Sequence, residues 1–205
     1  MRGAAWIAPV AIVGLAALLI GFALPTPVLH EVEAGLLYML LRFDQSLPLV
    51  GLGFAMTLMK RREIAAISIL IALGIGLGGM VGDMLAAMIE ADFDAIRFVF
   101  LFGPSFCVLI GIVLLAPIAL RAWTIPPAAL FSGVVLGLGT GGSFLGAANV
   151  EFAVGILLTG FLLILVPLVL AREFQGAWHR IAGRIFGSWL LAMGAMLGGL
   201  ELVRI

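Results

Sequence analysis

The sequence has 205 residues, of which 64% are hydrophobic and 11% are charged, whereas soluble domains carry roughly 45–50% apolar and about 25% charged residues. Eleven Lys and Arg residues balance eleven Asp and Glu residues, and this zero net charge excludes both electrostatic capture of nucleic acid and a disordered acidic tail. With a mean hydropathy of +1.29, the chain is predicted to be an integral membrane protein.

Apolar runs follow one another along the whole chain, near the length of about 20 residues that crosses a bilayer. They are too long and too uniformly apolar to be amphipathic helices of a soluble protein. We therefore predict an all-α fold, a polytopic transmembrane helical bundle of about seven spans that forms one domain over residues 1–205. The predicted spans cover residues 6–24, 34–59, 64–89, 98–120, 127–148, 152–171 and 185–203.

The first run, residues 6–24, lies between Arg2 and Pro25. It is longer than the apolar core of a usual signal peptide, and no A-x-A-like cleavage site follows it. We therefore predict a retained membrane span. A cleaved signal peptide is the alternative, and cleavage would leave six spans in the same orientation.

The charged residues sort by loop. The basic residues that fall on the side of the N-terminus are Arg2, Lys60, Arg61, Arg62, Arg121, Arg172, Arg180 and Arg184. The acidic residues that fall on the opposite side are Glu31, Glu33, Glu90, Asp92, Asp94, Glu151 and Glu201. Since basic loops stay in the cytoplasm, the N-terminus is predicted inside and the C-terminus outside, in a multi-pass protein of the cell inner (cytoplasmic) membrane.

Many of the 27 glycines recur at a spacing of four residues. In the third run these are Gly74, Gly78 and Gly82, and the later pairs are Gly137/Gly141, Gly142/Gly146, Gly183/Gly187 and Gly194/Gly198. Such spacing gives a helix one smooth face on which another backbone can approach closely. We interpret these faces as intramolecular helix contacts, with homo-oligomer contacts or a substrate groove as the alternatives.

Asp44 is the first candidate functional residue, because an ionisable group within the hydrocarbon is costly and marks a functional site by default. It lies about 15 Å from the outer end of the second run, at 1.5 Å per residue. In a continuous helix Arg42, two positions earlier, lies on a different face. Gln45 follows Asp44, and Pro48 frees a backbone carbonyl one turn earlier, which favours a cation-coordinating half-helix. A structural ion pair with another helix is the alternative.

Asp83 is the second candidate, because it lies about 9 Å from the outer end of its run and follows Gly82, where a neighbouring backbone can approach. Its alternative role is a hydrogen bond to a neighbouring helix. Asn149 and Glu151 mark the outer turn between the fifth and sixth runs. A carboxylate there either contributes to a solute entrance or caps the following helix.

His30, Glu31 and Glu33 form a small cluster before the second run. An imidazole and carboxylates can bind a divalent cation, so these residues are the candidate metal ligands, with solvated loop residues as the alternative. Apart from such a bound cation, no cofactor is expected.

Several activities have no residues to support them. The only lysine, Lys60, falls in a loop, which leaves a retinal Schiff base without an anchor, and His30 and His179 fall on opposite sides of the membrane, which excludes a shared haem. Neither H-E-x-x-H nor G-x-S-x-G occurs. The single cysteine, Cys107, excludes an intramolecular disulfide and a cysteine metal cluster. We therefore predict that the chain is not an enzyme.

The segment from Asp44 to Phe54 resembles part of the signature of the hydrogenase/urease accessory membrane family (HupE/UreJ), whose members are regarded as nickel or cobalt permeases. The resemblance places Asp44 on the signature aspartate and Gly53 on the glycine nine positions later. Residues 149–153 are similar to an acidic turn of the family, and residues 180–199 to its terminal helix.

Two family histidines are replaced in this chain. The position after the aspartate is Gln45, the position six residues before it is Tyr38, and a later histidine-rich motif has no counterpart. Because carboxylates prefer harder cations or protons to nickel, the resemblance implies a permease with a rebuilt site.

We therefore expect a small permease that moves a small solute, above all a cation. Asp44 would be the central site, Asp83 a second ligand or proton carrier, and Glu151 a residue near the entrance. The alternative is a non-catalytic anchor or assembly subunit of a larger membrane complex. The expected partners are the lipid bilayer, the solute, and a second copy or a partner membrane subunit.

Overall fold

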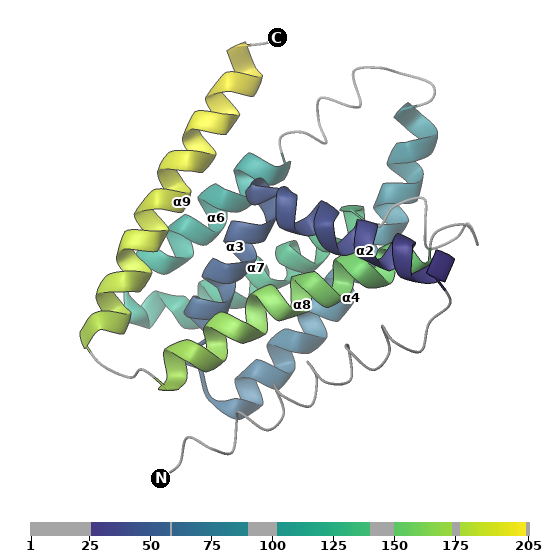
Figure 1. Ribbon diagram of the computed structural model, residues 1–205. Coiled ribbons are helices and arrows are strands. Elements are labelled where there is room, and N and C mark those ends of the chain that lie inside the picture. The colour runs from purple at the N-terminus through teal and green to yellow at the C-terminus, as the bar shows by residue number, and fades with distance from the viewer. Residues whose placement is uncertain (1–25, 58, 90–101, 140–149, 174–176, 204–205) are drawn as a thin grey trace.

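The computed structural model describes residues 26–57, 59–89, 102–139, 150–173 and 177–203. This part of the chain contains seven α-helices and no strand, which confirms the all-α prediction (Figure 1). The helices are α2 (Thr26–Leu41), α3 (Phe43–Met56), α4 (Arg61–Ile89), α6 (Phe102–Leu115), α7 (Ile118–Gly139), α8 (Val150–Glu173) and α9 (Ala177–Val203). The predicted first span, residues 6–24, lies outside the described residues.

Three of these helices are long and apolar enough to cross a membrane. The apolar stretches are Arg62–Gly82 in α4, Val150–Arg172 in α8 and Ile181–Leu200 in α9. Shorter apolar stretches cover Phe102–Leu115 in α6 and Trp123–Leu138 in α7. The described helices therefore have the composition of a membrane protein.

The second predicted span, residues 34–59, is an apolar run interrupted by Arg42, Asp44 and Pro48, and the structure breaks the helix at the first of these. Arg42 has φ −84° and ψ 76°, which are not helical values, and it separates α2 from α3. The two helices then pack on α8 at different places: a Cβ on Gly155 would lie 3.0 Å from Gly35 Cα in α2, whereas Gly53 in α3 contacts the Ile164 carbonyl. The predicted span is therefore a helix, a break and a second helix.

Two helices begin earlier than predicted. An apolar run marks only the apolar part of a helix, whereas the polar turns at its ends are helical as well. Helix α7 begins at Ile118 rather than at Pro127 and contains both Pro126 and Pro127. Helix α9 begins at Ala177 rather than at Ile185. Both helices thus include basic residues that the sequence had placed in loops.

The glycine faces pair helices within the chain. A Cβ on Gly74 in α4 would lie 2.9 Å from Gly133 Cα in α7, and a Cβ on Gly137 would lie 2.9 Å from Gly78 Cα. The interpretation as intramolecular contacts is therefore confirmed for α4 and α7.

Helices α6 and α9 pair through glycines in the same way. A Cβ on Gly111 in α6 would lie 2.9 Å from the Gly187 carbonyl oxygen in α9, and a Cβ on Gly194 would lie 2.7 Å from the Pro104 carbonyl oxygen. By contrast, a Cβ on Gly183 would meet no described atom within 4 Å, so its part of the predicted face is open. Gly141, Gly142 and Gly146 lie outside the described part of the chain.

Helices α3 and α6 supply much of the core. Leu49, Leu52, Phe106 and Ile110 are fully buried, and α3 contacts α6, α7, α8 and α9. Helix α9 lies at one edge of the molecule against α6 (Figure 1). Helix α3 is therefore anchored by its middle part in the core, and its first turn holds the candidate residues Asp44 and Gln45.

Candidate functional site

Arg42 and Asp44 form an ion pair at the break between α2 and α3. The guanidinium donates two hydrogen bonds, from Nε to Oδ1 at 3.0 Å and from Nη2 to Oδ2 at 2.9 Å. Such a two-pronged geometry is the strongest form of Arg–carboxylate contact. The side chains are 35% and 21% exposed, so the pair is partly withdrawn from solvent.

The prediction that Arg42 and Asp44 lie on different helix faces is wrong. It assumed a continuous helix, whereas Arg42 leaves the helical conformation and only Asp44 lies inside α3, in its first turn. The backbone N–H groups of Gln45 and Ser46 donate to the Arg42 carbonyl, so α3 starts directly after the break. The predicted alternative of an ion pair is thus realised within one segment rather than between distant helices.

Tyr38 holds the other side of the Arg42 guanidinium. Arg42 Nη1 donates to the Tyr38 hydroxyl at 3.2 Å, and the guanidinium lies 5.7 Å from the centre of the Tyr38 ring. The ring in turn packs on Phe152 of α8, with the ring centres 5.6 Å apart. Arg42 is therefore held by a carboxylate, a hydroxyl and an aromatic face together.

The first turns of α6 and α3 meet at the Asp44 carboxylate. A Cβ on Gly103 would collide with Asp44 Oδ2 and lie 2.9 Å from Asp44 Cγ, so any larger residue here would have to displace the carboxylate. Cys107 Sγ donates to the Asp44 carbonyl at 3.4 Å. Because Asp44 lies at two helix N-termini, both helix dipoles stabilise its negative charge.

The contact between α6 and α9 shows where the Arg42–Asp44 pair lies along the axis of α9. Gly194 of α9 meets Pro104, which follows Gly103 beside Asp44. The apolar stretch of α9 ends at Leu200, about 9 Å further along the axis at 1.5 Å per residue. The pair is therefore level with the part of α9 that lies about 9 Å before this apolar stretch ends.

Gln45 is buried in the same turn of α3, at 7% exposure. Two other buried polar residues bond within their own helices: Ser132 Oγ donates to the Ala128 carbonyl at 2.7 Å, and Thr159 Oγ1 to the Gly155 carbonyl at 3.1 Å. Gln45 Oε1 has no hydrogen-bond partner among the described residues. An orphaned buried acceptor is destabilising and calls for a functional explanation.

We expect Gln45→Met to leave the stability unchanged or to raise it by about 1 kcal/mol, because the variant removes a buried unsatisfied acceptor at similar volume. The measurement is thermal unfolding in detergent. Thr159→Val is the matched control, since it removes a hydroxyl that is satisfied and is expected to give no gain. A Gln45→Met loss above about 1 kcal/mol would show that the amide has a partner in the folded protein.

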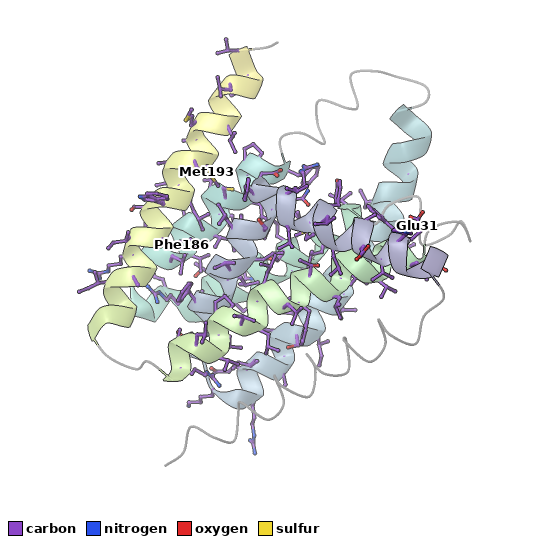
Figure 2. The ribbon with its side chains drawn as sticks, in the orientation of Figure 1. Glu31, Phe186 and Met193 are labelled. Carbon is purple, nitrogen blue, oxygen red and sulfur yellow. The ribbon has the colours of Figure 1, made fainter. Side chains whose placement is uncertain are left out.

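The candidate metal ligands lie on helix α2 and not in a loop. His30 Nδ1 and Glu33 Oε2 are 3.7 Å apart, with both side chains exposed. Figure 2 shows Glu31 at the far side of the molecule from Phe186 and Met193 of α9. Within the described ranges no group of three His, Cys, Asp or Glu side chains suits a metal ion, so the structure gives His30, Glu31 and Glu33 no shared centre.

The remaining acidic candidates are placed only in part. Glu151 lies in the first turn of α8, as the capping alternative requires. Asp83 lies within α4, but its side chain is outside the described part, as is the whole of Asn149. The predictions for the Asp83 side chain and for Asn149 thus lie outside the described residues.

At the opposite end of the molecule, arginines bond to backbone carbonyls at or just beyond the ends of helices. Arg172 Nη2 donates to the Met59 carbonyl at 2.7 Å, and Arg121 Nη2 donates to the Leu114 carbonyl at 2.7 Å. Burial, and then the positive charge of Arg184, lower the pKa of Arg121. The sequence did not predict this helix-end role, although basic residues after an apolar run are a known signal for it.

Apolar clefts open between the described helices. One of 390 Å³ lies mainly between α4 and α8, one of 470 Å³ between α3 and α9, and one of 610 Å³ between α6 and α9. Phe186 and Met193, both on α9, line the second cleft (Figure 2). Neither Arg42 nor Asp44 lines any of these three, so the polar site is separate from them.

Comparisons of the chain with protein-family models, with characterised proteins and with solved structures gave no match. The resemblance to the HupE/UreJ family thus stays a prediction from the quoted residues. Both positions where that resemblance expects histidine are part of the site, since Tyr38 binds Arg42 and Gln45 adjoins Asp44.

Proposed function

We propose that the chain is a small permease of the inner membrane that moves a small cation, with Asp44 as the central binding residue. The observation that supports it is the partly buried Arg42–Asp44 pair at a helix break inside apolar helices. Ionisable groups at such breaks form the solute sites of many transporters. Gln45 supplies a buried neutral acceptor in the same turn.

The proposed topology has seven spans, with the N-terminus inside and the C-terminus outside. The described arginines support this orientation, because Arg121 and Arg172 gather where α6 and α8 end and α7 begins. Under the positive-inside rule that end faces the cytoplasm. The Arg42–Asp44 pair then lies towards the outer face, where a solute from outside would first meet it.

In this proposal the cation passes from the outer face to Asp44 and then to the cytoplasmic end. Glu151 and Asn149 attract the cation near the entrance, and Asp83 serves as a second ligand or as a proton carrier. Gln45 contributes an uncharged oxygen ligand, which hard cations accept. Arg42 balances the Asp44 charge when no cation is bound.

The test is uptake of Na⁺, Rb⁺, Mn²⁺ and Ni²⁺ into proteoliposomes of the full chain. We expect Asp44→Asn to reduce uptake of the transported ion at least about 100-fold, because the variant removes the negative charge that attracts a cation to the central site. Glu63→Gln, at an exposed position in the first turn of α4, is the control and should retain uptake. Unchanged uptake in Asp44→Asn would overturn the site assignment.

The second candidate function is a membrane anchor or assembly subunit. It is favoured by the exposed apolar faces of α4 and α9, whose spanning stretches are only 22% and 17% buried. Purification in mild detergent separates the two functions. A partner protein at fixed stoichiometry would favour the subunit, whereas a chain that is pure and active in uptake would favour the permease.

A further inference from the structure

We propose that Arg42 is a tethered occupant of the Asp44 cation site, and that the transported solute is a monovalent cation that takes its place. This inference rests on the proposed function. In this proposal Arg42 determines how tightly Asp44 binds the solute and which solute charge the site accepts.

The first step is that the site is already filled. Arg42 donates to both carboxylate oxygens of Asp44, at 3.0 and 2.9 Å, and to the Tyr38 hydroxyl at 3.2 Å. Gly103 closes the side of the carboxylate that faces α6. A solute cation therefore competes with the guanidinium for the Asp44 carboxylate.

The second step is that Arg42 is able to leave. It lies at the break between two helices and not inside one, and its side chain is 35% exposed. A long arginine side chain can move its charged head toward water while its stem stays in apolar surroundings. Withdrawal of Arg42 breaks side-chain hydrogen bonds but none of the backbone bonds that start α3.

The third step is charge balance. Exchange of one guanidinium for one monovalent cation leaves the charge around Asp44 unchanged, whereas a divalent ion would leave an uncompensated positive charge in a low-dielectric region. A divalent ion would need further anionic ligands, and no group of three suitable side chains occurs in the part of the chain that the structure describes. Asp44 as the single carboxylate of the site thus suits a monovalent cation, and Asp83 then serves as the proton carrier and not as a second ligand.

The experiment compares ion binding by the full chain in detergent for the wild type, Arg42→Gln, and the double variant Arg42→Gln/Asp44→Asn. The probes are K⁺, Na⁺, guanidinium and Ni²⁺, each titrated separately while the thermal midpoint is followed. We expect Arg42→Gln to bind at least one of the three monovalent cations about tenfold more tightly than the wild type, which corresponds to the loss of a strong competing hydrogen bond. The double variant should lose this binding, and Ni²⁺ should gain nothing.

Two further variants keep the test interpretable. Arg121→Gln removes an arginine at the opposite end of the molecule and should leave the affinity at the wild-type value. Tyr38→Phe keeps the ring but removes the hydroxyl that accepts a hydrogen bond from Arg42. It should raise the affinity for the monovalent cation about two- to threefold. This variant tests the proposal if Arg42→Gln does not fold.

The other possible results overturn different parts of the proposal. Equal monovalent affinity in the wild type, Arg42→Gln and Tyr38→Phe would overturn the role of Arg42 but not the proposed function, provided that Asp44→Asn still abolishes uptake. A gain for Ni²⁺ in Arg42→Gln would overturn the monovalent class. Absence of ion binding and of uptake in every form, the wild type included, would overturn the proposed function itself.

Discussion

We expect Asp44→Asn to destabilise the protein by about 2 kcal/mol, and Arg42→Gln combined with Asp44→Asn to regain most of that loss. Breaking a buried ion pair from one side leaves an uncompensated charge and typically costs about 3–5 kcal/mol. The Arg42 and Asp44 side chains are 35% and 21% exposed, and solvent screening lowers the expected value. The measurement is unfolding of the purified protein in detergent, arranged as a double-mutant cycle.

The two single variants are not expected to be equal. Arg42→Gln leaves a carboxylate beside the N-termini of α3 and α6, which still stabilise its charge, whereas Asp44→Asn leaves a guanidinium without its counter-ion. Arg121→Gln is the control partner, because Arg121 bonds to Leu114 and Ala116 at the other end and should combine additively with Asp44→Asn. A coupling energy below about 0.5 kcal/mol between Arg42 and Asp44 would contradict the importance of the pair.

This coupling energy also bears on the proposed transport. A competitor that fills a site lowers the apparent affinity of any solute by the fraction of time for which the site is closed. A strong Arg42–Asp44 pair therefore stabilises the fold and weakens cation binding through the same contact. Stability and ion affinity should change in opposite directions in Arg42→Gln, which neither measurement alone would reveal.

The candidate site was predicted in its residues but not in its geometry. Asp44, Arg42 and Gln45 stand out as polar residues within an apolar run, whereas their arrangement depends on the break at Arg42. A carboxylate favours the first turn of a helix, and Asp44 occupies the first turn of α3. This signal was available but was outweighed by the continuous apolarity of the run.

Gly103 shows what sequence patterns cannot supply. Tyr38 lies four residues before Arg42, a spacing at which helical side chains are neighbours, whereas Gly103 meets Asp44 only because α6 packs beside α3. Gly103 has neither a charge nor a spacing to Asp44 that marks it in the sequence. Contacts between distant segments are fixed by tertiary packing, and one sequence does not record them.

For the glycine contacts, the sequence predicted a smooth face on one helix but not the helix that packs against it. The four-residue spacing of Gly74 and Gly78 correctly indicated a smooth face on α4, but it did not identify Gly133 of α7 as the partner. Gly35 and Gly155, which bring α2 and α8 together, were not singled out at all, because neither belongs to a four-residue pair. Spacing thus finds a face, and only the fold shows which face it meets.

We expect Gly74→Ala to destabilise the protein and Gly76→Ala to leave its stability unchanged or to raise it. A Cβ on Gly74 would press on the Leu130 carbonyl and lie 2.9 Å from Gly133 Cα. Since both neighbours are backbone atoms, the helices must separate, and overpacking of this kind costs about 1–3 kcal/mol. A Cβ on Gly76 meets no atom within 4 Å, and alanine is the better helix former by up to about 1 kcal/mol, so this variant should be neutral or more stable.

The comparison is stringent because both substitutions add the same methyl group to the same helix, two residues apart. The difference in helix propensity is therefore matched, and the two positions differ in burial, because Gly74 is buried against α7 and Gly76 is exposed. The measurement is the thermal midpoint in detergent for both variants, with Gly183→Ala, also at an open position, as a second neutral control. Equal midpoints for Gly74→Ala and Gly76→Ala would show that α4 and α7 are not in backbone contact. A loss confined to Gly74→Ala would instead establish that their glycine faces hold them together.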